Sequence, residues 1–286
     1  MSLPSSRPIR KVKPDQSAVL HGNVNWRDVD VLNRAYAKTT TVDLLEDVTR
    51  IFGDAICFAC SFGLEDVVLL DLLAAEKQSN VAFVTLDTLR LPPETIQFRT
   101  VLEARYTIQF HVLRPDGDDL AHFQNTIGDD GIFETMDARR SCCAVRKVEP
   151  LRRFLAERKA WVTGMRRGQS AARSQIEPFE WDIENGGKLK VNPLWNWSEQ
   201  DLIDYINDRQ LTVHPLHHQG VPSIGCAPCT RPVEGWRYGH VQPTIDTRAG
   251  RWWWEPKTSS QECGLHSHPS SSFTPLNKRK VIHTSS

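Results

Sequence analysis

Along the first half of the chain, short runs of apolar residues alternate with longer segments in which apolar and polar residues are mixed. Residues 55–60, 81–86 and 109–113 are short apolar runs of strand length. Between them, residues 65–76 and 92–105 have the length and composition of helices. Strands that alternate with helices in this way predict an α/β fold built on a parallel sheet.

Further elements are predicted on both sides of this unit. Residues 26–36 and 42–51 are expected to be helices, the second of them after Thr41 as its capping residue. Residues 161–163 read as a strand that ends at a glycine, and residues 188–192 as another strand. The predicted domain therefore has a helical N-terminus.

A capping box predicts one more helix. Ser198 precedes residues 199–209, and Asp201 stands where it caps the same turn reciprocally. Beyond about residue 236 the regular patterns fade, yet residues 252–254 are three tryptophans in a row. So much apolar surface is expected to dock on the domain.

These patterns predict one α/β domain over residues 25–235 and a mobile C-terminal tail over residues 236–268. Residues 1–24 and 269–286 are rich in Pro, Ser and basic side chains, so we expect them to be disordered. An organelle transit peptide is the alternative for the N-terminal arm, although the arm is short for one.

Composition narrows the class of protein. The 286 residues are 40% hydrophobic and 24% charged, as in ordinary globular proteins, and the net charge is +0. No broad electrostatic field attracts nucleic acid or an acidic membrane. The longest apolar stretch, residues 67–75, is too short to span a bilayer, and no signal-peptide core follows Met1. Seven cysteines, an odd number, indicate reduced thiols and a cytoplasmic protein.

Four of the cysteines form two pairs. Cys142 and Cys143 are adjacent, and Cys226 and Cys229 are spaced C-x-x-C. Four thiolates suit an iron–sulfur cluster or a structural zinc ion. Adjacent cysteines resist aiming both sulfurs at one ion, whereas a cluster with separate irons accepts them, so a cluster is favoured. Zinc, a redox disulfide and ordinary buried thiols are the alternatives.

The other three cysteines lie in two different sequence contexts, an apolar strand and the C-terminal tail. Cys57 and Cys60, also spaced C-x-x-C, lie in an apolar strand and are interpreted as core or loop residues, with a redox pair as the alternative. Cys263 stands in the tail, before a glycine and three residues before His266. Nearby cations would lower the pKa of its thiol and make it a nucleophile. An incidental exposed cysteine is the alternative.

Loops at predicted strand ends carry groups that suit anions. Residues 61–63 join a strand to a helix, so their N–H groups are candidates for cradling a phosphate. Residues 87–90 follow the second strand, and residues 164–173 bring three arginines after another. Arginine clusters of this density suit phosphate or sulfate. An ordinary turn and a solvated basic face are the alternatives.

Seven motifs occur in a fixed order over about residues 25–268: Ser61-Phe62-Gly63-Leu64-Glu65-Asp66, the segment 86–95, Cys142-Cys143-Ala-Val-Arg146-Lys147, Gly164-Met-Arg166-Arg167, Gly225-Cys226-Ala-Pro-Cys229, Arg248-Ala-Gly-Arg251-Trp-Trp-Trp-Glu255 and Glu262-Cys263-Gly264-Leu265-His266. This ordered set resembles assimilatory adenylyl-sulfate reductases of the phosphoadenylyl-sulfate (PAPS) reductase family. Leu89 departs from the family, which usually has Gly there. The turn from Gln169 to Arg173 is also shorter than usual, and no thioredoxin-like domain follows.

The resemblance implies an adenine nucleotide α-hydrolase-like (PP-loop-like) α/β fold. It implies an oxidoreductase that reduces adenylyl sulfate (APS) to sulfite and AMP through a Cys S-sulfonate, in sulfate assimilation and cysteine biosynthesis. The implied cofactor is a [4Fe-4S] cluster, and the implied electron donor is thioredoxin or glutaredoxin. A homo-oligomer is left open, and neither nucleic acid nor a membrane is an expected partner.

The same resemblance assigns roles to residues. The implied catalytic residues are Cys263 as nucleophile with Lys147, Arg248, Arg251 and His266. The implied nucleotide-binding residues are Ser61, Phe62, Gly63, Asp87, Thr88, Gly164, Arg166 and Arg173. The implied cluster ligands are Cys142, Cys143, Cys226 and Cys229.

Three other functions are weighed against this one. PAPS reduction is the nearest, although in this family the paired cysteines usually accompany APS. An ATP pyrophosphatase or tRNA-thiolating enzyme would have a longer Ser-Gly-Gly-type loop than residues 61–63 provide. A non-catalytic zinc module would leave the segment around Cys263 without a purpose.

Overall fold

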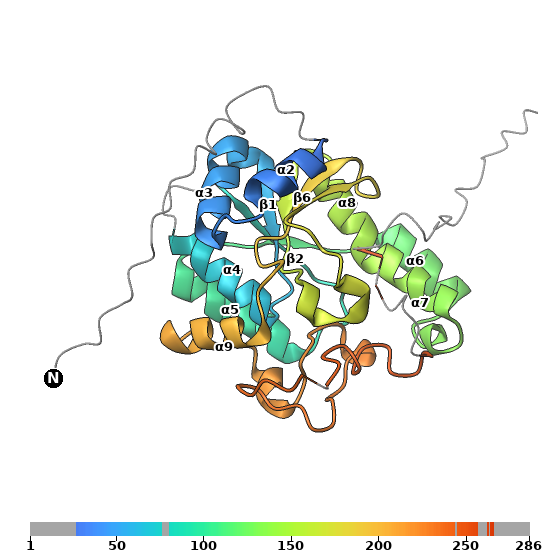
Figure 1. Cartoon of the computed structure of the whole chain (residues 1–286). Coiled ribbons are helices and arrows are strands. Elements are labelled where there is room, and N and C mark those ends of the chain that lie inside the picture. Colours follow the sequence, from blue (N-terminus) through green and yellow to red (C-terminus); the bar gives the residue numbers. More distant parts are fainter. Residues whose placement is uncertain (1–26, 76–79, 244, 257–261, 263, 266–286) are drawn as a thin grey trace, which may run out of the picture.

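A six-stranded sheet organises the chain (Figure 1). The structure, a computed structural model, describes residues 27–75, 80–243, 245–256, 262 and 264–265. The predicted N-terminal arm, residues 1–24, and C-terminal end, residues 269–286, lie outside these residues. So do residues 244, 257–261, 263 and 266–268 of the predicted tail. The order of strands is β3-β2-β1-β4-β6-β5, and all neighbours are parallel except β5 and β6.

In chain order the described elements are α2 (Val29–Tyr36), α3 (Thr41–Phe52), β1 (Ile56–Ala59), α4 (Leu64–Ala75), β2 (Ala82–Leu86), α5 (Pro93–Tyr106), β3 (His111–Leu113), α6 (Gly117–Thr126), α7 (Met136–Cys143), a π-helix (Ala144–Val148), α8 (Glu149–Leu155), β4 (Ala160–Val162), β5 (Phe179–Asp182), β6 (Lys188–Val191) and α9 (Glu199–Asp208). Short 3-10 turns cover Gly53–Ala55, Gly131–Phe133, Arg167–Gln169, Ala171–Arg173, Pro215–Gln219 and Ala227–Cys229.

Both faces of the sheet are buried, as the continuous apolar runs predict. On β1, Ile56 and Phe58 enter the largest core cluster with residues of α3, α4, α5 and α9. Cys57, between them, faces the other way into a second cluster with Trp161 and Leu151 of α8. Figure 1 shows α4, α5 and α9 on one side of the molecule and α6, α7 and α8 on the other. The predicted core role of Cys57 and Cys60 is confirmed, since both are buried.

The predicted parallel unit is confirmed, with strand ends shifted by one or two residues. One cap differs from the prediction: Thr40, not Thr41, caps α3, because its hydroxyl accepts a hydrogen bond from the Asp43 N–H at 3.1 Å. The Thr41 hydroxyl instead donates to the Pro193 carbonyl. The capping box of Ser198 and Asp201 is present as predicted.

Three helices and a strand were not predicted. The helices α6, α7 and α8 have mixed polar sequences, and the strand β5 pairs antiparallel at the edge of the sheet. The docking expected for the tryptophans holds for Trp252, which is buried, whereas Trp253 is 44% exposed.

The order of strands reverses beside β1. From β1 the chain first moves to β2 and β3 on one side, and later returns to β4 on the other. Loops after β1 and β4 therefore diverge and open a crevice at the carboxyl ends of the strands, the usual ligand position in such sheets.

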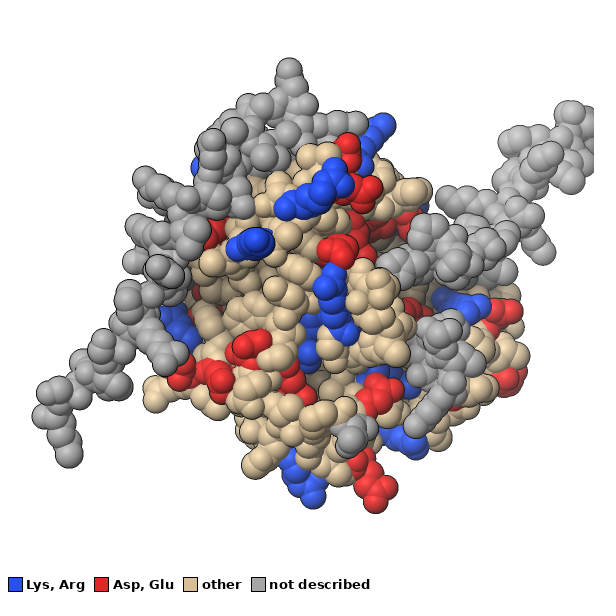
Figure 2. Space-filling model, viewed as in Figure 1, with Lys and Arg blue, Asp and Glu red and all other residues tan. Residues whose placement is uncertain are grey.

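Figure 2 shows acidic and basic side chains mixed over one face of the described surface. None of the described helices is long and apolar enough to cross a bilayer.

Candidate active site

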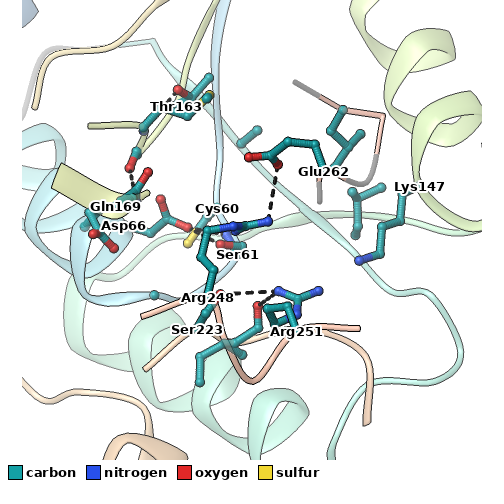
Figure 3. A pocket seen from close by; sticks show the side chains of 18 of the residues that line it. Cys60, Ser61, Asp66, Lys147, Thr163, Gln169, Ser223, Arg248, Arg251 and Glu262 are labelled. Carbon is teal, nitrogen blue, oxygen red and sulfur yellow. Dashed lines mark hydrogen bonds and ion pairs between the residues drawn. The ribbon is translucent and has the colours of Figure 1, made fainter. Parts of the chain in front are cut away.

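A cavity lies at this switch point (Figure 3). We call it the main cavity. The loops after β1 and β4 form one wall, and the opposite wall contains Thr247, Arg248, Arg251, Trp252, Glu262 and Leu265. Its charged lining residues are Glu65, Asp66, Lys147, Arg173, Arg248, Arg251 and Glu262.

The wall on the sheet side is held by a buried carboxylate. Asp66, in the first turn of α4, accepts hydrogen bonds from both the N–H and the hydroxyl of Ser61, the latter at 2.7 Å. Burial raises the pKa of Asp66 to about 6, although the bonds from Ser61 oppose the shift. The Ser61 N–H, a candidate for cradling an anion, is thus engaged within the protein.

Gly164 faces the same carboxylate across the crevice. A Cβ at position 164 would lie 2.3 Å from Asp66 Oδ1, closer than atoms can approach. The glycine therefore lets the loop after β4 pack against the start of α4. Gly63 also lines the main cavity, whereas Phe62 does not. The Phe62 ring is buried edge-on against Phe98 and Phe110.

The opposite wall is held by arginines and one glutamate. Arg173 contacts the Glu262 carboxylate with both Nε and Nη2, at 2.8 and 2.9 Å. Arg248 reaches the same carboxylate at 3.3 Å (Figure 3). Burial would raise the pKa of Glu262, but Arg173 and Arg248 outweigh it and lower the pKa. Glu262 is therefore an anion held by two cations.

Arg251 joins this wall to the cysteines. Its Nε donates to the Cys229 carbonyl at 3.2 Å and its Nη1 to the Ile224 carbonyl at 2.9 Å. Its guanidinium also lies over the buried Trp252 ring, 4.9 Å from the centroid. Gly225 leaves room for this side chain, because a Cβ there would fall 2.3 Å from Arg251 Nη2.

The four paired cysteines meet in a second, smaller cavity, which we call the cysteine cavity. It is lined by Arg90, Ile132, Arg139, Cys142, Cys143, Arg146, Lys147, Cys226, Pro228 and Cys229. All four cysteines are buried and free of disulfides. Cys142 and Cys143 come from the last turn of α7, whereas Cys226 precedes a 3-10 turn and Cys229 is its last residue. Segments 83 residues apart in the chain thus converge.

The four thiols do not share one environment. Burial would raise the pKa of Cys226, but Lys147, the Thr88 hydroxyl and Arg251 outweigh it, and the pKa is lowered. The Thr88 hydroxyl lies 3.2 Å from Cys226 Sγ. Burial and the neighbouring Cys226 raise the pKa of Cys229 to about 11, and burial raises the pKa of Cys142. Cys226 is the most acidic thiol of the cavity among these three.

Lys147 lines both the main cavity and the cysteine cavity. It belongs to the π-helix Ala144–Val148, which follows the adjacent cysteines directly. A π-helix has one more residue per turn than an α-helix and is often found at functional sites. Lys147 thus lies where the lining residues of the two cavities meet, and Figure 3 shows its side chain at the edge of the main cavity.

Besides Phe62, three more residues predicted to bind the nucleotide lie outside the lining of the main cavity. Asp87 accepts hydrogen bonds from the Leu89 N–H and from Arg114, both at 3.0 Å. Thr88 is buried beside Cys226 instead. Arg166 is buried in an ion pair with Glu65, with 2.7 Å between Nε and Oε1.

The loop after β2 also explains the departure at Leu89. Leu89 has φ 59° and is 53% exposed. This left-handed conformation favours glycine and costs other L-residues roughly 1–2 kcal/mol. A glycine at this position, as is usual in the family that the sequence resembles, would adopt the turn without that cost.

Cys263 and His266, the predicted nucleophile and its neighbour, lie outside the described residues. The structure instead draws attention to Asp66, Glu262 and Gln169, which the sequence did not assign to the site. Gln169 accepts from Arg173 Nη1 and donates to the Gly164 carbonyl, so it braces the loop after β4. Asp66 and Glu262 each belong to a recognised motif, which was the only signal for them in the sequence.

The donor set of the cysteine cavity limits what it can hold. Within the described residues, no three His, Cys, Asp or Glu side chains are arranged to hold a single metal ion. A cluster makes a different demand, because each sulfur binds its own iron. Four buried cysteines around one cavity, with three arginines and Lys147 in its wall, meet that demand in number, element and charge.

The chain is similar in sequence to a known protein family and to named members of it. The family described as phosphoadenosine phosphosulfate reductase domain matches residues 55–232. The adenosine 5'-phosphosulfate reductase of Allochromatium vinosum is 43% identical over 232 residues, which cover 80% of this chain and 85% of that protein. The adenosine 5'-phosphosulfate reductase of Neisseria meningitidis serogroup A is 42% identical, over 73% of this chain and 82% of that protein.

Among solved structures, the phosphate complex of phosphoadenylyl-sulfate reductase from Candida auris has a TM-score of 0.60 and 27% identity, and covers 72% of this chain and 98% of that chain. The expected α/β fold is confirmed.

Proposed function

Since the chain belongs to the phosphoadenosine phosphosulfate reductase family, we propose that it reduces APS to sulfite and AMP. It is an oxidoreductase that acts on the sulfur of an adenine nucleotide in assimilatory sulfate reduction. The observation that carries the proposal is the arrangement of the two cavities. An arginine-lined cavity at the nucleotide position of the sheet shares Lys147 with a cavity of four cysteines.

The first chemical step is a nucleophilic substitution at sulfur. The Cys263 thiolate attacks the electrophilic sulfur of APS, the bond from that sulfur to the phosphate oxygen breaks, and AMP leaves as an anion. The product is a Cys263 S-sulfonate. Arginine and lysine side chains are needed here, because an anion attacks a group that already carries negative charge.

The second step needs an external dithiol, for which thioredoxin or glutaredoxin is proposed. One donor thiolate attacks the Cys263 sulfur and expels sulfite, which leaves a mixed disulfide. The second donor thiol resolves this disulfide and restores the Cys263 thiol. The donor is oxidised by two electrons, the same two that convert the sulfate-level sulfur to sulfite.

The described residues divide these tasks between the two walls. Ser61, Asp66 and Gly164 belong to the rigid sheet side and are proposed to meet the nucleoside. Arg173, Arg248, Arg251 and Lys147 are proposed to meet the phosphosulfate. His266 is proposed to assist Cys263 from the same tail. Phe62, Asp87, Thr88 and Arg166 are proposed to shape the loops rather than to touch the substrate, since they do not line the main cavity.

Cys142, Cys143, Cys226 and Cys229 are proposed to hold a [4Fe-4S] cluster. Arg90, Arg139, Arg146 and Lys147 surround them and offset the negative charge of four thiolates. When bound, the cluster supplies a structural and electrostatic centre beside the substrate. Protein purified anaerobically should contain about four irons and four acid-labile sulfides per chain. Zinc without sulfide would reject this assignment.

PAPS is the second candidate substrate, because the related Candida auris structure is a PAPS reductase. PAPS carries one more phosphate than APS, a dianion that requires additional cationic donors. A sulfite-release assay with thioredoxin should give a kcat/KM at least ~10-fold higher for APS than for PAPS, which is about 1.4 kcal/mol. Equal or reversed values would assign the chain to PAPS, and no sulfite from either would reject the proposed function.

A further inference from the structure

One acidic side chain stands where a reductase of this kind should receive an anion. Glu262 lines the main cavity, and its carboxylate bridges Arg173 and Arg248. The other two carboxylates of the lining are engaged elsewhere: Glu65 pairs with Arg166, and Asp66 with Ser61. Among the described carboxylates that line the cavity, Glu262 is therefore the one that pairs with Arg173 and Arg248.

The contact has the geometry of oxyanion binding. Both oxygens of Glu262 face Arg173, in the bidentate arrangement that guanidinium also forms with phosphate and sulfate. Arg248 adds a third nitrogen at 3.3 Å from Oε2. Arg173 comes from the loop after β4 and Arg248 from the distant tail, so the carboxylate joins both walls.

The side chain is not needed to fix its own backbone. The Glu262 carbonyl accepts a hydrogen bond from Arg139 Nη1 at 2.9 Å. Arg139 is fully buried, and its Nε and Nη2 donate to the Glu255 carboxylate at 2.7 and 3.0 Å. The main chain at residue 262 thus has a rigid anchor, and the side-chain contact with Arg173 and Arg248 is separable from it.

We propose that Glu262 is a tethered competitor that occupies the oxyanion subsite of Arg173 and Arg248 until the phosphosulfate of the substrate displaces it. This proposal rests on the proposed function. A tethered carboxylate acts at an effective concentration in the millimolar range or higher. A free inorganic anion must compete with it using the two arginines alone, whereas a nucleotide adds contacts along the sheet-side wall.

The consequence is a lower occupancy of the substrate-free site by inorganic oxyanions. Sulfate and phosphate have the same oxygen geometry as the reacting end of APS, and a vacant pair of arginines would bind them. Displacement of Glu262 weakens the binding of every anion by the same factor. A weak inorganic ligand is then lost at ordinary concentrations, while a tightly bound nucleotide remains.

The test is the binding of inorganic sulfate and of AMP to a Glu262→Gln variant, by calorimetry at constant ionic strength. Glutamine keeps the size of the side chain and removes its charge. The Kd for sulfate should fall at least ~5-fold relative to the wild type, and the Kd for AMP should fall by a similar factor. Glu234→Gln, an exposed residue, removes the same charge from the surface and should leave both Kd values within ~1.5-fold.

The sign of the change decides the question. If Glu262 only anchored the tail, its removal would leave the Kd for sulfate unchanged or raise it, and either result overturns the proposal. Glu262→Asp, which shortens the side chain by one methylene, should lower the Kd for sulfate by about 2-fold. It is the deciding variant should Glu262→Gln fail to fold, and an unchanged or higher Kd would then overturn the proposal.

Failure of this inference is distinguishable from failure of the proposed function. Sulfate and AMP binding need no turnover, so they report on Glu262 alone. Sulfite release from APS by the wild type reports on the reaction alone. Turnover without tighter sulfate binding in the variant removes only the role of Glu262, and tighter binding without turnover removes only APS reduction.

Discussion

The two walls of the main cavity are built by different means. On the sheet side, Ser61 and Gly164 follow parallel strands directly, and their positions are set by the backbone hydrogen bonds of β1 and β4. On the tail side, Arg248 and Arg251 lie in turns outside the sheet, and the described tail has one isolated bridge, between Thr230 and Arg251. There, side-chain contacts of guanidinium groups add to the few backbone hydrogen bonds of the turns.

This difference suits two tasks. A wall fixed by backbone is suited to recognise a part of the substrate that does not change, such as the nucleoside. A wall fixed by ion pairs can exchange one anion for another at little cost, because each pair formed replaces a pair broken. The tail wall is also tied to the cysteine cavity, since the Arg231 N–H bonds to the Gly250 carbonyl and the Trp252 N–H to the Cys229 carbonyl.

The largest expected effect lies on the tail side. Cys263→Ser removes the proposed nucleophile and leaves every described cation in place. Sulfite release from APS should fall at least ~1000-fold, because a serine hydroxyl is a far weaker nucleophile than a thiolate near neutral pH. Affinity for AMP should stay within ~2-fold of the wild type, and the iron content should not change.

Mass spectrometry identifies the intermediate of the same step. Wild-type protein incubated with APS and no reductant should gain the mass of one sulfonate, and the modified peptide should contain Cys263. An adduct on Cys226 or another cysteine, or substantial turnover by the serine variant, would reject Cys263 as the nucleophile.

The two walls also differ in how far the sequence predicts them. The sheet side follows from local patterns: the apolar runs at β1, β2 and β4 mark the strands, and the loops that matter come next in the chain. On the tail side, the motif around Arg248 and Cys263 is visible in the sequence, but not its contacts. That Glu262 reaches Arg173, 89 residues away, depends on packing that no local pattern encodes.

Burial is the second property that the sequence does not give. Asp66 looks like an ordinary acidic residue in the first turn of a helix, yet it is only 4% exposed. The π-helix is missed for a related reason, because residues 144–148 have an ordinary helical composition and their extra residue per turn arises from tertiary packing. Both features contribute to the main cavity, through Asp66 and Lys147.

A smaller effect is expected on the sheet side, from the charge of Asp66. Its pKa of about 6 in the folded chain exceeds the ordinary value of 3.8, so the folded state holds the proton more tightly than the unfolded state. Stability from this group is present below about pH 4 and is lost as the pH rises through about 6. At 1.36 kcal/mol per pKa unit the loss is roughly 3 kcal/mol, of which about half falls between pH 5 and 7.5.

Asp66→Asn should remove this dependence, because asparagine accepts the same bond from the Ser61 N–H and does not ionise. Both proteins are denatured chemically at several pH values between 5 and 7.5. The free energy of unfolding of the variant should increase relative to that of the wild type as the pH rises, by about 1–2 kcal/mol over this range. A difference in the free energy of unfolding that stays constant with pH would show that Asp66 is ionised throughout.

The smallest effects give the sharpest comparison of the walls, because the same substitution can be made in each. Neither Gly164 nor Gly225 has a positive φ, so alanine changes the space rather than the backbone. Gly164→Ala places a methyl group against Asp66 Oδ1 and 3.0 Å from Glu65 Cβ. It should weaken the binding of AMP and of APS about equally, by ~10-fold, or about 1.4 kcal/mol.

Gly225→Ala places its methyl group against the guanidinium of Arg251 instead. It should leave the Kd for AMP within ~2-fold and lower kcat for APS by ~5- to 10-fold, because Arg251 is proposed to act on the reacting end. Gly117→Ala, where nothing lies within 4 Å of the added Cβ, is the matched control and should change neither quantity. Equal losses of AMP affinity in Gly164→Ala and Gly225→Ala would show that both walls bind the nucleotide, and the division between a recognising wall and a reacting wall would fall.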